Sequence, residues 1–311
     1  MDRFDCMRAF TRVVELHSFT KAAQSLSLPK ATLSAQVAAL EKQLSVKLLH
    51  RTTRHVSVTT SGEAYYHRVI QLLRDLEETE SAVSQSRVSH KGRLRIDSSA
   101  TLTREVLLPS VNNFFTRYPE IELEIGSTDR TVDLLEENVD CAIRGGMPID
   151  ESLVARKLLN THRITCASPT YLAQNGTPLT PEDIKRHAVV NFQSPRTNKI
   201  NPFMYEIEGK MTEINGRRRL ATNDTGACVA AALSDIGLIQ LPYLAVRSHI
   251  ESGRLVQVLS NTPSEVITLY IVYLQNRHLS ANVRAFVDWA VELFKQEQKW
   301  YDANCLQSIH Q

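Results

Sequence analysis

The feature that most constrains the fold of this chain is its stretch at residues 18–44, SFTKAAQSLSLPKATLSAQVAALEKQL. Ser18 is a good N-cap for a helix that continues to about Leu26. Proline is tolerated only in the first turn of a helix, so a second helix is expected to begin near Pro29. The apolar residues of this second helix recur at helical spacing and predict one buried stripe: Leu33, Val37, Leu40 and Leu44.

The opposite face of the second helix carries small side chains and hydroxyls. A helix with such a face can approach another surface closely, and the major groove of DNA is wide enough to accept it. A further amphipathic helix, with apolar residues spaced from Phe4 to Val14, precedes the pair. Two helices joined by a short turn, with the second exposed, form a helix-turn-helix, although an ordinary helical hairpin has the same pattern.

A second basic feature follows at residues 50–66, which read HRTTRHVSVTTSGEAYY. Val56 and Val58 alternate after Arg51 and Arg54, the pattern of a short hairpin, or wing, with cations suited to phosphates and to the minor groove. Residues 1–58 hold nine lysines and arginines against four acidic residues, a net charge of +5 when the whole chain carries +2. Such a basic head fits a polyanion, here double-stranded DNA, or a merely solvated surface. The candidate DNA contacts are Ser18, Thr20, Lys30, Ala31, Thr32, Ser34, Ala35, Ala38, Arg51, Thr52, Thr53 and Arg54.

This N-terminal stretch resembles the DNA-binding domain of LysR-type transcriptional regulators, and the likeness extends to about residue 298. The matching landmarks are Phe19, Ala22, Ala23, Leu26, Ser34, Leu40, Glu41, Leu44, Leu48, Arg51, Thr59 and Gly62. Two positions depart from the family pattern, because Ala35 stands where Arg is common and Ser45 where Gly is usual. Alanine methyls make no bidentate hydrogen bonds to bases. We therefore expect the polar contacts of the helix to come from Lys30, Thr32 and Ser34, and much of the specificity from the wing and from DNA shape.

Residues 61–89 form a third segment, which contains no proline and has its only glycine, Gly62, at the start. Its apolar residues fall on a narrow coiled-coil-like seam: Tyr65, Val69, Leu72, Leu76 and Val83. Such a seam favours a dimer partner over packing on the chain's own body. The resemblance implies an antiparallel pair of these helices and a tetramer. Gly92 is a plausible hinge to the rest of the chain.

Beyond residue 92 strand and helix patterns alternate, which predicts a mainly parallel sheet covered on both faces. The expected strands are RLRID, IELEI, VDCAI, RITCAS, HAVVNF, RRRLAT, IGLIQL and ITLYIVYL, with helices at 104–117, 128–137, 168–174, 224–234, 243–251 and 280–297. The polar tail after Lys299 is expected to be loosely ordered.

The predicted fold class is α plus α/β, in three parts. Residues 1–60 are expected to form a winged helix-turn-helix, 61–89 a linker helix, and 92–300 an effector-binding domain. The resemblance implies that this last domain is similar to periplasmic binding proteins, with lobe 1 at about 92–165 and 266–300 and lobe 2 at about 166–265.

Polar side chains follow three strands of the expected first lobe. In open α/β sheets ligands bind at the carboxyl ends of strands and near helix N-termini. Hydroxyls, amides and an arginine there suit a small anionic effector, although the hydroxyls can equally be helix caps and Arg144 can belong to an ion pair. The candidate effector contacts are Ser98, Ser99, Thr101, Ser127, Thr128 and Arg144, with Asn191, Phe192, Asn223 and Asp224 as weaker candidates on lobe 2.

Other functions are weaker predictions. The five cysteines have no metal-ligand spacing, so we expect no metal and no cofactor, although Cys141 and Cys166 allow a thiol-based redox sensor. Nucleotide-binding and hydrolase motifs are absent, which argues against an enzyme. The run at residues 217–219, RRR, is expected to be a solvated strand edge rather than a second nucleic-acid site. We expect a cytoplasmic protein without membrane contact that works with RNA polymerase.

Overall fold

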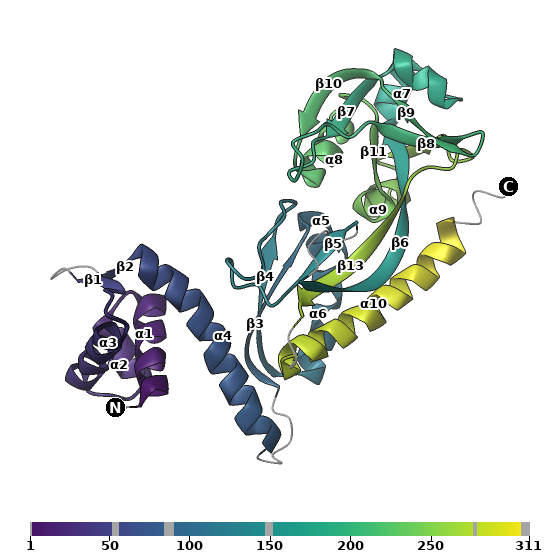
Figure 1. The fold of residues 1–311 in the computed structure, drawn as a ribbon. Coiled ribbons are helices and arrows are strands. Elements are labelled where there is room, and N and C mark those ends of the chain that lie inside the picture. Colours follow the sequence, from purple (N-terminus) through teal and green to yellow (C-terminus); the bar gives the residue numbers. More distant parts are fainter. Residues whose placement is uncertain (1, 52–55, 84–89, 147–151, 276–278, 306–311) are drawn as a thin grey trace. The chain divides into compact units, whose positions relative to one another are not determined.

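The computed structural model describes residues 2–51, 56–83, 90–146, 152–275 and 279–305 (Figure 1). The chain divides into two compact units, one made mainly of residues up to Ser89 and the other mainly of residues from His90 on. The wing candidates Thr52, Thr53 and Arg54 lie outside the described residues.

The first unit is a helix-turn-helix with a wing, as predicted. Its elements are α1 (Arg3–Leu16), α2 (Phe19–Ser25), α3 (Lys30–Leu44), β1 (Leu49–Arg51), β2 (Val56–Val58) and the long α4 (Thr60–Val83). The Ser18 hydroxyl accepts a hydrogen bond from the Lys21 amide and caps α2. The first strand of the wing pairs with the second in antiparallel register, Leu49 opposite Val58.

The core of this unit forms where the predicted stripe of α3 meets α1. Leu33, Val37 and Leu40 are fully buried against Phe10 and Val13, while Leu44 is only partly buried. Ser45 ends α3 in the left-handed conformation, with φ of 55°. Glycine adopts that conformation without strain and serine does not, so the unusual serine costs about 1 kcal/mol.

The buried carboxylate of Glu41 ties α3 to the wing. It accepts hydrogen bonds from the amides of Leu48 (3.0 Å) and Leu49 (3.1 Å) and from the ammonium of Lys47 (3.1 Å). Burial raises the pKa of Glu41, but the hydrogen bonds from Leu49, Lys47 and Leu48 outweigh burial and hold its pKa below the ordinary value.

The apolar residues expected to form one seam along α4 differ in their burial. Val69 packs into the core of the first unit together with Leu73, which the seam did not include. Leu72 is 51% exposed and Leu76 is half-buried, whereas the side chain of Val83 lies outside the described residues. Part of the seam is therefore buried within the unit, because Val69 lies where α4 packs against α1.

The second unit is built on a mixed sheet in the order β11-β6-β13-β5-β3-β4, with β12 also paired to β6. The strands are β3 (Lys91–Ser98), β4 (Glu120–Ser127), β5 (Cys141–Gly145), β6 (Leu153–Ala167), β11 (Ile239–Pro242), β12 (Val256–Val258) and β13 (Val266–Leu274). Only β3 with β4 and β3 with β5 are parallel here. The expectation of a mainly parallel sheet is thus wrong for this sheet, because β6 and β13 cross it as long antiparallel strands.

The remaining elements cover this sheet or form the second half of the unit. They are α5 (Ala100–Leu102), a π-helical turn (Thr103–Leu107), α6 (Leu108–Arg117), α7 (Pro169–Asn175), a 3-10 helix (Pro181–Arg186), β7 (Ala188–Phe192), β8 (Phe203–Ile207), β9 (Lys210–Ile214), β10 (Arg217–Thr222), α8 (Thr225–Leu233), α9 (Tyr243–Glu251) and α10 (Ala281–Cys305). We call β3–β5 with α5 and α6 lobe 1, and α7–α9 with β7–β12 lobe 2. Strands β6 and β13 run between them (Figure 1).

Two further expectations in this unit are wrong, and one hairpin was not predicted. Residues 128–137 form turns rather than a helix, since the Thr128 hydroxyl accepts from the Arg130 amide and competes with helical hydrogen bonds. The hairpin of β8 and β9 was not predicted. The tail is also more ordered than expected: α10 continues to Cys305, and Tyr301 is 4% exposed in the core of lobe 2.

We predict that Glu41→Gln lowers the free energy of unfolding of the first unit by about 1–2 kcal/mol at neutral pH, because the ion pair with Lys47 and its charge-assisted hydrogen bonds are lost. A depressed pKa stabilises the fold above the unfolded pKa, and this stabilisation disappears as the pH falls through the folded value. The gap between wild type and variant should therefore close in acid, as followed by calorimetry. Glu15→Gln, which loses only an exposed pair with Arg12, is the control. A gap that does not depend on pH would contradict this account.

Candidate DNA-binding and effector-binding sites

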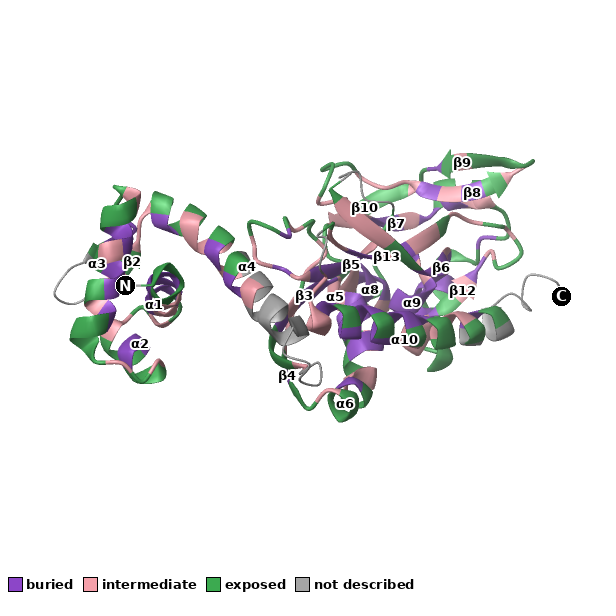
Figure 2. Cartoon of the chain, turned by 60° about the horizontal axis from the view of Figure 1, so that its bottom comes forward, coloured by how far each residue is buried: buried purple, intermediate pink, exposed green. Residues whose placement is uncertain are grey.

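The predicted DNA-contact residues share the outer side of α2 and α3. Figure 2 shows that α3 has a buried side and an exposed side. Thr20 is exposed on α2, and Ser18 and Ser34 are half-buried. The exposed residues of α3 are Lys30, Ala31, Thr32, Ala35 and Ala38. The structure thus presents one lysine, one threonine and three methyl groups on this face, while the backbone of Arg51 lies on β1 of the wing.

The predicted effector contacts of lobe 1 come together at the ends of three neighbouring strands. Ser98 lies opposite Ser127 in the register of β3 and β4, and opposite Ile143, the neighbour of Arg144, in the register of β3 and β5. The Thr128 amide donates to the carbonyl of Ser98 (3.0 Å), which holds the ends of β3 and β4 together. Topology alone therefore gathers residues that are far apart in the sequence.

Two of these residues are buried hydroxyls that lack a hydrogen-bond partner in the described part of the chain. Ser98 is 0% exposed and Thr101 is 4% exposed. The hydroxyl of Thr103, which begins the π-helical turn, is also buried without a hydrogen-bond partner among the described residues, and the sequence did not predict it as a site residue. An unpaired buried hydroxyl costs about 1–3 kcal/mol, so such a cluster marks a site where an external group can supply the missing partner. The π-turn after Leu102 is the other signal here, since π-turns concentrate at functional sites.

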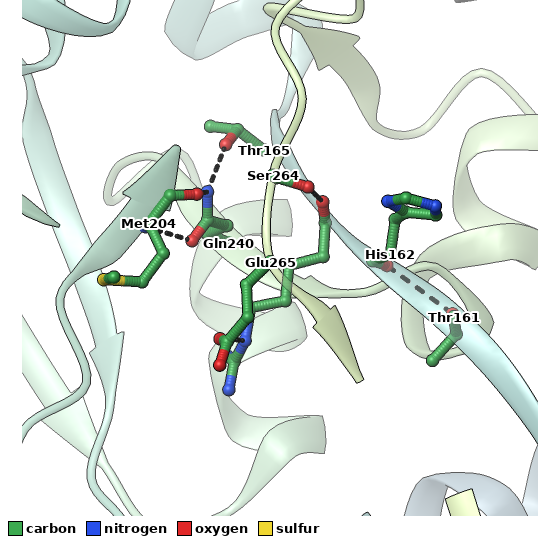
Figure 3. Close-up of polar contacts among 8 residues, drawn as sticks. Thr161, His162, Thr165, Met204, Gln240, Ser264 and Glu265 are labelled. Atoms are coloured by element: carbon green, nitrogen blue, oxygen red, sulfur yellow. Dashed lines mark hydrogen bonds and ion pairs between the residues drawn. The ribbon is translucent and has the colours of Figure 1, made fainter. Parts of the chain in front are cut away.

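A second set of buried polar groups in the domain, around Gln240, satisfies its own hydrogen bonds. Where β6 crosses into lobe 2, the side-chain Nε2 of Gln240 donates to the Thr165 hydroxyl (3.4 Å) and to the backbone carbonyl of Met204 (3.2 Å). The side-chain Oε1 of Gln240 accepts from the backbone amide of Met204 (2.8 Å; Figure 3). The Thr165 hydroxyl also bonds to that of Tyr205. The unpaired hydroxyls at the strand ends are therefore not a general property of this fold.

Ser99 and Arg144 already have partners. The Ser99 hydroxyl caps α5 by accepting from the Leu102 amide (3.3 Å). The Arg144 guanidinium forms an ion pair with the buried carboxylate of Asp97 and donates to the carbonyl of Ile143 (3.0 Å). Its Nε atom is buried without a partner among the described residues. Gly126 allows this arrangement, because a Cβ there would lie 2.2 Å from Asp97 Oδ2.

The candidate effector contacts on lobe 2 are held mainly by residues of lobe 2 itself. Asn191 donates to the carbonyl of Asn201 (2.9 Å), and Phe192 lies beside Thr222 in the register of β7 and β10. Asn223 is exposed, and Asp224 caps α8 by accepting from the Ala227 amide (2.6 Å). A direct contact between lobes was not foreseen: the Thr225 amide donates to Asp129 Oδ2 (2.7 Å).

The cysteine pair considered as a redox sensor does not come together. Cys141 begins β5, two strands across from the start of β6, and Cys166 lies near the far end of β6. Both are fully buried, as is Cys228. Burial raises the pKa of Cys141 and of Cys166 and raises that of Cys228 to about 12, which keeps these thiols protonated and unreactive.

A winged helix-turn-helix on the same chain as an α/β domain with a polar site at its strand ends is the architecture of a DNA-binding regulator with its own sensory domain. Two family models match this chain: the bacterial regulatory helix-turn-helix protein of the lysR family over residues 4–63, and the LysR substrate binding domain over residues 87–295. The chain belongs to the LysR family of transcriptional regulators and carries that family's effector domain.

Similar proteins agree with this assignment. The HTH-type transcriptional regulator YhjC of Escherichia coli (strain K12) is 37% identical over 302 residues, which cover 95% of this chain and 99% of the relative. An HTH-type transcriptional repressor of Pseudomonas aeruginosa is 37% identical over 298 residues, covering 95% and 93%. Among solved structures, the LysR-type regulator CrgA from Neisseria meningitidis superposes with a TM-score of 0.60 at 29% identity, covering 93% of this chain and 98% of CrgA.

We predict that Ser98→Ala and Thr101→Val leave the free energy of unfolding of the second unit unchanged or raise it by up to about 1 kcal/mol, because each removes a buried hydroxyl without a partner. Thr165→Val, the matched control, should lose about 1–3 kcal/mol because it strands Tyr205 and Gln240. Calorimetry of the full chain measures both. A loss in the first two variants as large as that in Thr165→Val would show that these hydroxyls are satisfied in solution.

Proposed function

We propose that this LysR-family protein is a sequence-specific regulator whose DNA binding responds to a small anionic effector at the strand ends of lobe 1. The observation that carries the proposal is the pair of buried hydroxyls of Ser98 and Thr101, which have no hydrogen-bond partner among the residues that the structure describes. They lie at the N-terminus of the helical segment that starts at Ala100, inside the matched effector domain.

The anionic character of the effector follows from the donors at this helix start. The first amides of a helix have no intrahelical partner, and the helix dipole favours negative charge there. Ser127, Thr128 and the buried Nε of Arg144 supply further donors at the neighbouring strand ends. The carboxylates of Asp129 and Asp224 accept from amides at the start of α8, so the anion would sit on the lobe 1 side.

Binding would act by preferring one arrangement of the two lobes, since a ligand can shift an equilibrium only by its differential affinity for the two states. The hydrogen bond between Asp129 and the Thr225 amide is one contact that distinguishes a closed arrangement from an open one. Phe192 and Asn223 would then complete the site from lobe 2.

Assembly is the other part of the proposal. Members of this family bind DNA and effectors as oligomers, and Leu72 offers an exposed apolar contact on α4 for a dimer partner. Two heads would read two half-sites, and two dimers would form a tetramer. Acting on promoter DNA places the protein in the cytoplasm beside RNA polymerase, in a regulatory role and not as an enzyme. In the part of the chain that the structure describes, no helix has the length and apolar character to cross a membrane.

DNA contact is testable residue by residue. Lys30→Gln, on the exposed face of α3, should weaken binding to all DNA and reduce the salt slope by about one, the loss of a single phosphate contact. Ala35→Ser, which adds a hydroxyl on the same face, should alter base preference instead. The double change Arg51→Ala and Arg54→Ala should lower both affinity and preference, since the wing is proposed to carry much of the specificity.

Fluorescence anisotropy across a salt series measures these changes, with Lys199→Gln in lobe 2 as the control of equal charge. Unchanged affinity and preference in the wing double variant would overturn the proposed role of the wing.

A further inference from the structure

A groove of about 600 Å³ lies between β6 and α10, away from the strand ends of the effector site. Its lining includes Lys157, Leu158, Leu159, Lys295, Lys299 and Asp302. The three ammonium groups against one carboxylate give these side chains a net charge of +2. None of these residues belongs to the set proposed to contact the effector.

The lysines of the groove stay unneutralised because the nearby acidic residues of α10 are paired with arginines elsewhere. Asp288 pairs with Arg156 (2.8 Å), Glu297 pairs with Arg247 (2.6 Å), and Glu292 pairs with Arg117. Within the described residues, the three lysines of the groove form no ion pair of their own. Lys295 and Lys299 are one helical turn apart, so they project from the same face of α10.

The walls of the groove are fixed by a chain of hydrogen bonds. The backbone amide of Asn160 donates to Gln298 Oε1 (2.8 Å), and the Thr268 hydroxyl donates to the side-chain Oδ1 of Asn160 (2.8 Å). Gln298 Nε2 in turn donates to Asp302 Oδ1 (2.8 Å), which holds this carboxylate on the helix. Leu158 and Leu159, which are buried, also line the groove. The groove is thus a preorganised feature of both β6 and α10.

We propose that this groove is a second ligand site, which takes a compact phosphate-bearing anion. Its volume lies in the range of small-molecule sites. Carboxylates are recognised most specifically by the planar fork of arginine, which the lining lacks, whereas lysine binds phosphate as a point charge. Three lysines on β6 and α10 match the charge of a diphosphate group.

A ligand in this groove would also act on the domain as a whole. Both walls run from lobe 1 to lobe 2: β6 pairs with β13 and then with β11, while α10 carries Tyr301 into the core of lobe 2. Bridging β6 and α10 would therefore favour the arrangement of the lobes in which the groove has this width. The site does not depend on the effector proposed above.

The test is calorimetric titration of the full chain with inorganic pyrophosphate, at constant ionic strength and without DNA. We expect one binding site per chain. The double variant Lys295→Gln and Lys299→Gln should bind pyrophosphate at least about tenfold more weakly, because two charge-assisted contacts are lost. Lys199→Gln with Lys210→Gln, two exposed lysines of lobe 2 outside the groove, is the matched control and should bind as wild type. Melting temperatures check that all variants fold.

Two further arms keep the assignment specific. Binding should persist in Ser98→Ala and in Lys30→Gln, which separates the groove from the effector site and from the DNA-binding head, and citrate should bind more weakly than pyrophosphate. No binding to the wild-type chain, or equal binding by the groove variant, would overturn the site. Citrate binding as tight as pyrophosphate binding would overturn the assignment to phosphate.

Discussion

The pairing of β6 with β13 is the constraint on which the rest of the effector domain depends. The two strands pair from Leu153 opposite Leu274 to His162 opposite Val266, with one register shift at Leu158, and β6 then continues to pair with β11 and β12. One uninterrupted strand therefore serves both lobes. Because β6 is continuous and pairs with β13 and then with strands of lobe 2, a change in the arrangement of the lobes has to bend this strand. The polar contacts around Thr165 and Gln240 secure the point where it enters lobe 2 (Figure 3).

Two clusters of buried polar groups in the same domain differ in their hydrogen bonding, and this contrast is the basis of the proposed effector site. Where β6 enters lobe 2, buried hydroxyl and amide groups form hydrogen bonds with one another and stabilise a unique packing. At the end of β3 and in the helical segment that follows it, Ser98, Thr101 and Thr103 are buried without hydrogen-bond partners among the described residues, which costs stability. Asp97 and Arg144 beside them form an ion pair that holds the strand ends in place. A ligand that bonded to these hydroxyls would restore the lost stability, which is the usual relation between a binding site and its fold.

Local patterns in the sequence predicted the helix-turn-helix and the cluster of polar residues at the strand ends. Ser18, Pro29 and the stripe from Leu33 to Leu40 define the helix-turn-helix through capping and helical periodicity. Polar residues directly after strands predicted the cluster at Ser98 and Ser127, because strand ends meet whatever the details of the sheet. Features set by distant contacts were not predictable: turns replace a helix at 128–137, α10 extends into lobe 2 through Tyr301, and Val69 turns toward the head. The groove was not predictable from the sequence, because its lysines come from β6 and α10, which are far apart in sequence and meet only in the fold.

The central claim is that the exposed face of α3 and the wing read a particular DNA sequence, and that the second unit serves this reading. The most direct measurement is the affinity of the full chain for the DNA upstream of its own coding region, compared with scrambled DNA of the same length and composition over a range of salt concentrations. Nonspecific contacts to phosphates weaken steeply with salt and show no preference. We predict a clear preference for the upstream DNA that persists at physiological salt. Equal binding to both DNAs, lost in parallel as salt rises, would contradict the account and leave only a basic head.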